Sequence, residues 1–364
     1  MTTTIGAVAG VPGLLSQSEI ADSARHLASL QLRSGAVPWF VGGHCDPWNH
    51  VEAAMALTVT GHVDEAKAAY RWLADTQLGD GSWFNYYVGD QVRDSRLDTN
   101  VCAYVAAGLY HYLVATNDVD LCAALWPVVQ RAIDFVLRYQ YDDGTIAWSL
   151  DCIGRRESYA LLTGSSSIFH SLRCAVALAE RLDVAKPEWE LAAGRLGHAV
   201  AHHPGAFAPK NEFAMDWYYP IFSGALFGDA GAKRIDDGWE RHVMDGYGVR
   251  CVSTSDWVTA AETAECVLAL DALGQTGLAL DLFSFTRRHR REDGAYWTGI
   301  AYPSEVTFPD RETTSYTAAA IILAADALTS SSAAAGLFRH DSLPMPIDLP
   351  EPGCPLSAHA RQRA

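Results

Sequence analysis

The sequence predicts an all-α fold, an (α/α)6 toroid in which six helical hairpins close into a ring. Two observations support it. A unit of helix, Gly/Trp turn, carboxylate and second helix recurs about six times, most clearly from Ala66 to Leu113. The second helices are apolar nearly all round, whereas the first helices carry Lys and Arg on one face. Because such a repeat cannot bury its apolar face alone, it packs on its neighbours, which predicts an inner ring of buried helices inside an outer ring.

The hairpins follow one another with a loose period of 40–66 residues between equivalent carboxylate or glycine positions. Asp46-Pro47 carries the expected start signal, an N-cap followed by proline at the first helical position. The predicted first helices are one from Ile20, then Ala66–Leu73, Val128–Tyr139, Trp189–Ala201, Lys233–Met244 and Leu278–Arg290. The predicted second helices are Trp48–Thr58, Val101–Leu113, one opening at Ser165–Ser167, one from Asp216 through Phe222, Val258–Leu273 and Ser315–Leu328.

These elements form one catalytic domain, residues 16–329, preceded by an N-terminal arm, residues 1–15. Beyond Thr329 the composition shifts to Ser, Ala and Pro, which predicts an extended or disordered tail over residues 330–364.

The formal net charge of -16 argues against nucleic acid or an anionic membrane surface as a partner. No apolar run is long enough to span a bilayer, and the N-terminus lacks the basic residues of a signal peptide. The eight Cys include no C-x-x-C pair, which is typical of reduced, buried thiols. His44 and His50 lack the spacing of helical zinc ligands, so we expect neither a metal nor another cofactor. A cytoplasmic enzyme fits these features, and the oligomeric state stays open.

The turn Gln77–Trp83 resembles the Q-x-x-x-G-x-W repeat of squalene cyclases and prenyltransferase β-subunits. Gln31–Trp39, Gln140–Trp148 and Arg291–Trp297 are weaker copies. The resemblance concerns architecture, because the D-x-D-D acid motif of the cyclases and the zinc ligands of the prenyltransferases are both missing. An isoprenoid enzyme remains a rival, which a cavity that is apolar throughout would favour.

Two other segments, Gly42–His50 and Asp256–Glu265, place carboxylates beside Trp in separate repeats. They resemble the sites of toroidal inverting glycosidases such as trehalases, glucoamylases and mannosylglycerate hydrolases. The pairing also resembles mycobacterial endomannosidases that cleave α-1,4-linked methylmannose polysaccharides. That resemblance implies an inverting hydrolase acting, with endo cleavage, on a neutral oligosaccharide. Two rival functions stay open: a non-catalytic carbohydrate-binding toroid and, more weakly, a polysaccharide lyase.

Hydrolysis of a glycosidic bond needs one carboxyl group as acid and a second as base or nucleophile. We expect Asp46 to be the general acid and Glu262 the general base, by resemblance to trehalase-like enzymes, although the opposite assignment is open. Asp46 could instead be a plain helix cap, and Glu262 a paired helical Glu. Glu265 competes with Glu262 for the role of base, and Asp256 is expected to cap the helix.

The remaining candidates surround these two carboxylates as predicted sugar-binding groups, because aromatic rings stack on sugars and polar side chains bind hydroxyls. Capping explains Asp98, Asn100 and Asp216 about as well. The predicted substrate-binding residues are His44, Trp48, Asn49, Asp98, Asn100, Asp216, Trp217, Tyr218, Trp257, Glu265 and Tyr316.

Overall fold

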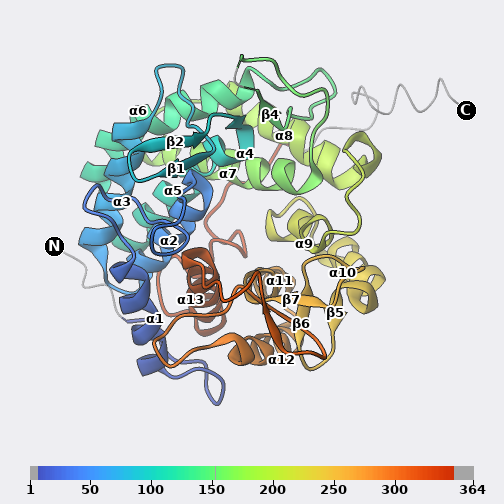
Figure 1. Cartoon of the computed structure of the whole chain (residues 1–364). Coiled ribbons are helices and arrows are strands. Elements are labelled where there is room, and N and C mark those ends of the chain that lie inside the picture. Colours follow the sequence, from blue (N-terminus) through green and yellow to red (C-terminus); the bar gives the residue numbers. More distant parts are fainter. Residues whose placement is uncertain (1–6, 152, 348–364) are drawn as a thin grey trace, which may run out of the picture.

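The computed structural model describes residues 7–151 and 153–347. Helices dominate it, as the sequence predicts. Six buried helices each pack against the next in chain order, and the last packs against the first, so that their packing closes on itself (Figure 1). These inner helices are α2 (Pro47–Val59), α5 (Val105–Thr116), α7 (Leu162–Arg181), α9 (Ala214–Phe222), α11 (Ala260–Ala272) and α13 (Ser315–Thr329).

Six further helices lie outside the inner ones, and each packs its apolar face on at least one of them. In α11 every residue from Ala260 to Leu270 is buried, whereas α10 buries only four residues, because it faces water on its other sides. The outer helices are α1 (Gln17–Ser29), α3 (Val63–Thr76), α6 (Val119–Leu137), α8 (Pro187–His202), α10 (Gly228–His242) and α12 (Thr276–Phe285).

The Gln/Gly turns fasten neighbouring outer helices together. Gln77 Nε2 donates to Gly81 O at 3.0 Å within its own turn and to Val128 O of α6 at 2.9 Å. Gly81 has φ +98°, and a Cβ there would lie 2.2 Å from Arg131 O of α6. Both the left-handed backbone and the close approach therefore require glycine.

The same pattern recurs in two more turns: Gln31 donates to Glu65 O of α3, and Gln140 donates to Ala192 O of α8. The recurring turn is thus explained by helix packing, without reference to any reaction.

Short strands, which the sequence did not predict, lie between the helices. β1 (Tyr86–Val88) pairs with β2 (Gln91–Asp94), and β3 (Leu97–Asp98) pairs with β4 (Ser149–Leu150). A five-stranded antiparallel sheet has the order β5 (Val243–Met244), β6 (Gly248–Arg250), β7 (Trp257–Thr259), β8 (Gly299–Ala301) and β9 (Val306–Phe308). The 3-10 turns η1 (Pro204–Ala206) and η2 (Thr286–His289) complete the elements.

The structure corrects three predicted boundaries, two of them because of these strands. The predicted helix Val258–Leu273 begins as β7 and becomes helical only at Ala260, because Val258 pairs with Ile300 in the sheet. The predicted helix Lys233–Met244 ends at His242, where β5 begins. The predicted helix Val101–Leu113 is divided at Tyr104 into α4 (Thr99–Ala103) and α5.

Residues 330–347 pack against the C-terminal ends of the inner helices. Phe338 stacks on Phe222 at the end of α9 with ring centroids 4.4 Å apart, and Arg339 pairs with Asp271 near the end of α11. Arg173 of α7 donates to Pro344 O. In Figure 1 this red-brown segment crosses the middle of the ring of helices. This part of the predicted tail therefore belongs to the folded body, while the rest, from 348, lies outside the described residues.

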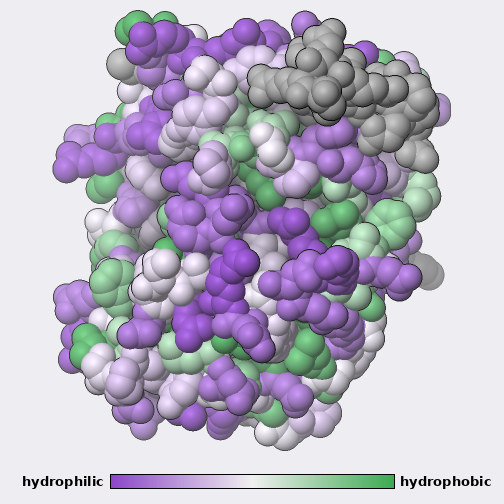
Figure 2. Space-filling view, turned by 90° about the vertical axis from the view of Figure 1, so that its right-hand side faces the viewer, coloured by the Kyte–Doolittle hydropathy of each residue, from purple (hydrophilic) through white to green (hydrophobic). Residues whose placement is uncertain are grey.

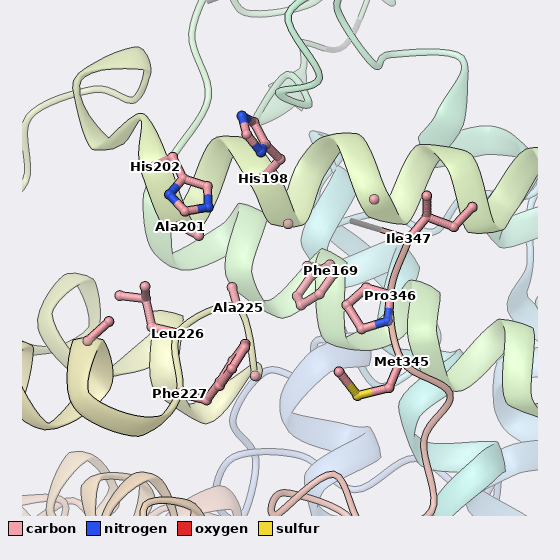
Figure 3. A pocket seen from close by; sticks show the side chains of 14 residues that line it. Phe169, His198, Ala201, His202, Ala225, Leu226, Phe227, Met345, Pro346 and Ile347 are labelled. Atoms are coloured by element: carbon pink, nitrogen blue, oxygen red, sulfur yellow. The ribbon is translucent and has the colours of Figure 1, made fainter. Parts of the chain in front are cut away.

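An apolar cavity of about 340 Å³ lies between helices α8 and α10 (Figure 3). Phe169, Phe227 and Met345 line it from three parts of the chain, and its described lining includes no carboxylate. Figure 2 views the molecule from this side and shows a mostly hydrophilic surface with small hydrophobic spots. Among the described residues, no helix has the length and apolarity that crossing a membrane requires.

Candidate active site

A second cavity of about 340 Å³ opens at the starts of the inner helices, opposite the end that residues 330–347 cover. Six equivalent positions line it. The second residue of α2, α4, α7, α9, α11 and α13 contributes to the wall in every case, and these residues are Trp48, Asn100, Thr163, Met215, Ala261 and Tyr316. Because they share one position in the repeat, they form a single layer, which we call the second-residue layer.

Asp46 lies beside this layer as the N-cap of α2 and is buried. Its Oδ1 accepts from Asn49 N at 2.9 Å, and its Oδ2 accepts from Trp39 Nε1 at 2.6 Å and from Asn49 Nδ2 at 2.5 Å. Burial raises the pKa of Asp46, and the three donors partly offset that effect. The capping role that the sequence predicts for Asp46 is therefore present, and the carboxyl group also lines the cavity.

Asp98 repeats this arrangement at the start of α4. It caps the helix through Asn100 N and Val101 N, and its Oδ2 accepts from Trp148 Nε1 at 2.6 Å. Burial raises the pKa of Asp98 to about 6. At the starts of both α2 and α4, a carboxyl group thus caps the helix through one oxygen and accepts from an indole N–H through the other.

Glu262 reaches the cavity from the first turn of α11 and is 8 % exposed. Its Oε2 has no hydrogen-bond partner among the described residues. Because a buried polar atom normally has a partner, this oxygen is a candidate contact for a ligand or a water molecule. Asp46 and Glu262, which lie in the first and fifth repeats, line the same cavity as the sequence predicts.

Glu265 lies one turn further along α11 and is held by tyrosines. It accepts from Tyr219 OH at 2.9 Å and also from Tyr218 OH. Burial raises the pKa of Glu265 well above its ordinary value, and the nearby charge of Glu52 acts in the same direction. Since both of its oxygens are already bonded, Glu265 fits the role of base less well than Glu262.

Glu52, which was not among the residues predicted from the sequence, is buried on α2 and accepts from Tyr104 OH. Burial raises the pKa of Glu52 to about 7. Its position in an apolar helix with no Lys or Arg nearby in the sequence could have drawn attention to it.

Several predicted binding residues line the cavity, and others do not. Those that line it are Trp48, Asn49, Asp98, Asn100, Glu265 and Tyr316. His44 lies between Trp39 and Tyr86, with ring centroids 4.3 and 4.4 Å away, and so lies behind the wall. Tyr218 acts only through Glu265.

Asp216, Trp217 and Trp257 are not in the lining. Asp216 lies at the start of α9, as predicted, but in its first turn and not at the N-cap, and its carboxylate accepts from the backbone and hydroxyl of Thr163 and caps nothing in α9. Trp217 Nε1 donates to Arg234 O at 2.7 Å. Trp257 packs edge-on against Phe308 in the sheet.

Asp256 does not cap α11 either, because β7 separates it from the helix, whose N-cap is Thr259. The strand moves the start of the helix beyond the reach of that side chain.

Sequence reasoning missed part of the lining. Trp39 and Trp148 end two of the recognised turns, and their position in the repeat was the available signal. The other missed residues come from β1, the loops beside it and the inner helices, and they are Asn85, Tyr86, Arg96, Val101, Thr163, Met215, Tyr219 and Ala261. Strand β1 was not predicted, so nothing in the sequence placed Tyr86 near Asp46.

Within the described part of the chain, no group of three or more His, Cys, Asp and Glu side chains is arranged to hold a metal ion. His198 and His202 do have the i, i+4 spacing on α8, with ring centroids 4.8 Å apart, but they line the apolar cavity between α8 and α10. The candidate active site contains four carboxyl groups, those of Asp46, Asp98, Glu262 and Glu265. The cavity is therefore not apolar throughout, which is the feature that would have favoured an isoprenoid enzyme.

The fold is shared with glycoside hydrolases. A glycosidase variant in complex with glucose superimposes with a TM-score of 0.68 at 14 % identity over 86 % of this chain and 98 % of its own. The GH63 mannosylglycerate hydrolase from Thermus thermophilus superimposes with a TM-score of 0.65 at 12 % identity over 83 % and 99 %. At such identities the likeness concerns the fold alone, and no protein-family model matches the sequence.

Sequence similarity decides the family. The chain is 48 % identical over 344 residues to the MMP endo-(1,4)-3-O-methyl-alpha-D-mannosidase of Mycolicibacterium hassiacum, covering 94 % of this chain and 95 % of that protein. The chain therefore belongs to the family of this endomannosidase, and it is a glycoside hydrolase.

Proposed function

We propose that the protein is a cytoplasmic, inverting glycoside hydrolase that cleaves α-1,4-mannosidic bonds within 3-O-methylmannose oligosaccharides or polysaccharides. The observation that carries the proposal is the pair of carboxyl groups, Asp46 and Glu262, in one cavity of a chain 48 % identical to an enzyme named for that reaction. We further propose that the inner and outer helices form an (α/α)6 toroid over residues 16–329, in agreement with their closed order of packing.

Asp46 is assigned as the general acid. Its buried position raises its pKa, as an acid that delivers a proton to the leaving oxygen requires. Trp39 and Asn49 then hold the carboxyl group in one orientation and stabilise the carboxylate that remains after the transfer.

Glu262 is assigned as the general base. Its Oε2 has no partner among the described residues and is available to accept a proton from water. In an inverting enzyme the two carboxyl groups stand roughly 6.5–9.5 Å apart, so that this water fits between the base and the sugar. Attack from the opposite face of the sugar converts the α-linkage into a β-configured product.

The aromatic part of the wall supports a sugar substrate. Trp48 and Tyr316 occupy neighbouring positions in the second-residue layer, and Trp39 packs against Tyr316 with ring centroids 5.2 Å apart. Such faces stack on pyranose rings. The net charge of -16 agrees with a neutral substrate.

The test is hydrolysis of an α-1,4-linked 3-O-methylmannose oligosaccharide followed by proton NMR. We expect internal cleavage and a β-anomer as the first product, with both lost in Asp46→Asn and Glu262→Gln. An α-anomer as the first product would contradict the inverting mechanism. Absence of cleavage of any mannoside by the wild-type protein would contradict the function itself.

A further inference from the structure

The second-residue layer of the cavity has two unlike sides. On one side, neighbouring helices α13 and α2 present the aromatic residues Tyr316 and Trp48. On the other side, neighbouring helices α9 and α11 present Met215 and Ala261. We call these two aliphatic residues, Met215 and Ala261, the aliphatic wall.

The polar groups at the starts of α7 and α9, beside this wall, bind one another. Thr163 Oγ1 donates to Asp216 Oδ1, and the backbone N–H of Thr163 donates to the same oxygen at 3.1 Å. Arg234 of α10 donates to the backbone O of Asp216 at 2.6 Å. These contacts draw the polar groups at the starts of α7 and α9 into the protein and leave the Met215 side chain to line the cavity.

We propose that the aliphatic wall recognises a methyl ether on the sugar and sets the preference for methylated over unmethylated mannosides; this inference rests on the proposed function. The side chains of Met215 and Ala261 offer a sugar hydroxyl no hydrogen-bond partner in exchange for its bonds to water, whereas a methyl ether gains apolar contact with them. One methyl or methylene group in an apolar pocket changes discrimination by about 10- to 200-fold.

The test compares kcat/KM on two oligosaccharides of equal length, one 3-O-methylated and one not. Met215→Gln keeps the size of the side chain and adds polar atoms to the wall. We expect it to lower the methylated-to-unmethylated ratio by about 10-fold, chiefly through a loss of activity on the methylated sugar. Met345→Gln, at a residue that is 80 % exposed beside the apolar cavity between α8 and α10, is the matched control and should leave the ratio unchanged.

An equal loss of activity on both sugars, or a ratio that does not change, would overturn the proposal. A wild-type protein that cleaves both sugars equally well would also overturn it, while the proposed function would stand. Calorimetric binding of methyl 3-O-methyl-α-D-mannoside and of methyl α-D-mannoside gives a second readout that does not depend on cleavage. If the wild-type protein cleaves neither oligosaccharide, the proposed function is contradicted. The role of the wall is then decided by binding alone: we expect tighter binding of the 3-O-methylated mannoside by the wild-type protein and loss of that preference in Met215→Gln.

Discussion

The starts of α2 and α4 hold their carboxyl groups in the same way, and the start of α11 holds its own differently. Asp46 and Asp98 each cap a helix through Oδ1 and each accept from an indole through Oδ2 at 2.6 Å. Glu262 caps nothing, and its Oε2 has no partner among the described residues.

This difference separates two ways of holding a carboxyl group at the start of an inner helix. The donors around Asp46 and Asp98 fix each carboxyl group in one place, because every bond would have to break before it could move. Glu262 lines the same cavity, but its Oε2 has no fixed donor among the described residues. The repeated helix cap thus supplies two tightly held carboxyl groups, and the start of α11, which departs from that pattern, supplies one that is held less tightly.

Glu262→Gln should have the largest effect. The amide cannot accept the proton, so we expect kcat to fall by about 10²- to 10⁴-fold with little change in the melting temperature. Glu292→Gln, at an exposed position, is the matched control. If Glu265→Gln were instead the more damaging variant while Glu262→Gln kept its activity, the base would be Glu265.

Asp46→Asn and Asp98→Asn test whether two equally held carboxyl groups have equal roles. Asn caps helices about as well as Asp, so neither variant should unfold the protein. We expect Asp46→Asn to lower kcat by about 10²- to 10⁴-fold and Asp98→Asn to act mainly on KM. Similar losses of kcat in both variants would contradict the assignment of Asp46, and not Asp98, as the general acid.

Glu52→Gln tests the second carboxyl group of α2, which has a tyrosine hydroxyl as donor but no indole. Its pKa is about 7 in the folded protein and 4.5 as the ordinary value, so the folded state binds a proton that the unfolded chain has released. Stability should therefore fall as the pH rises from about 4.5 to 7. Between pH 5 and pH 8 the free energy of unfolding of Glu52→Gln should decrease less than that of the wild-type protein, by up to about 3 kcal/mol, as measured by urea unfolding. An unchanged slope would mean that Glu52 titrates normally.

Trp39→Phe should have the smallest effect, a decrease in kcat of about 10-fold or less, since it removes one hydrogen bond to Asp46. Losing that donor raises the pKa of Asp46 further. If Asp46 is the acid, the alkaline limb of the pH–rate profile moves to higher pH; if it is the base, the acidic limb moves instead. Trp148→Phe, which loses the matching bond to Asp98, should move neither limb.

Much of this architecture could be predicted from the sequence, because a helix that buries an apolar face has apolar residues that recur with the helical period. The buried helices around Trp48–Thr58 and Ser315–Leu328 were predicted to within two residues. The five-stranded sheet was not predicted, since strands of two or three residues such as β7 are defined by partners distant in the chain. The failure of Asp256 to cap α11 follows from the same cause, because β7 lies between this residue and the helix.

The sequence by itself determined the helical class, the repeating turns and the two carboxyl groups, Asp46 and Glu262, that we propose react. Each of these depends on residues close together in the chain. Only the tertiary structure decided that Trp39 and Trp148 hold Asp46 and Asp98, that Glu262 has an unpaired oxygen and that Met215 lines the wall. The Trp148–Asp98 bond and the cavity lining join segments from different repeats, and such contacts become visible only once the helices are assembled around a shared cavity.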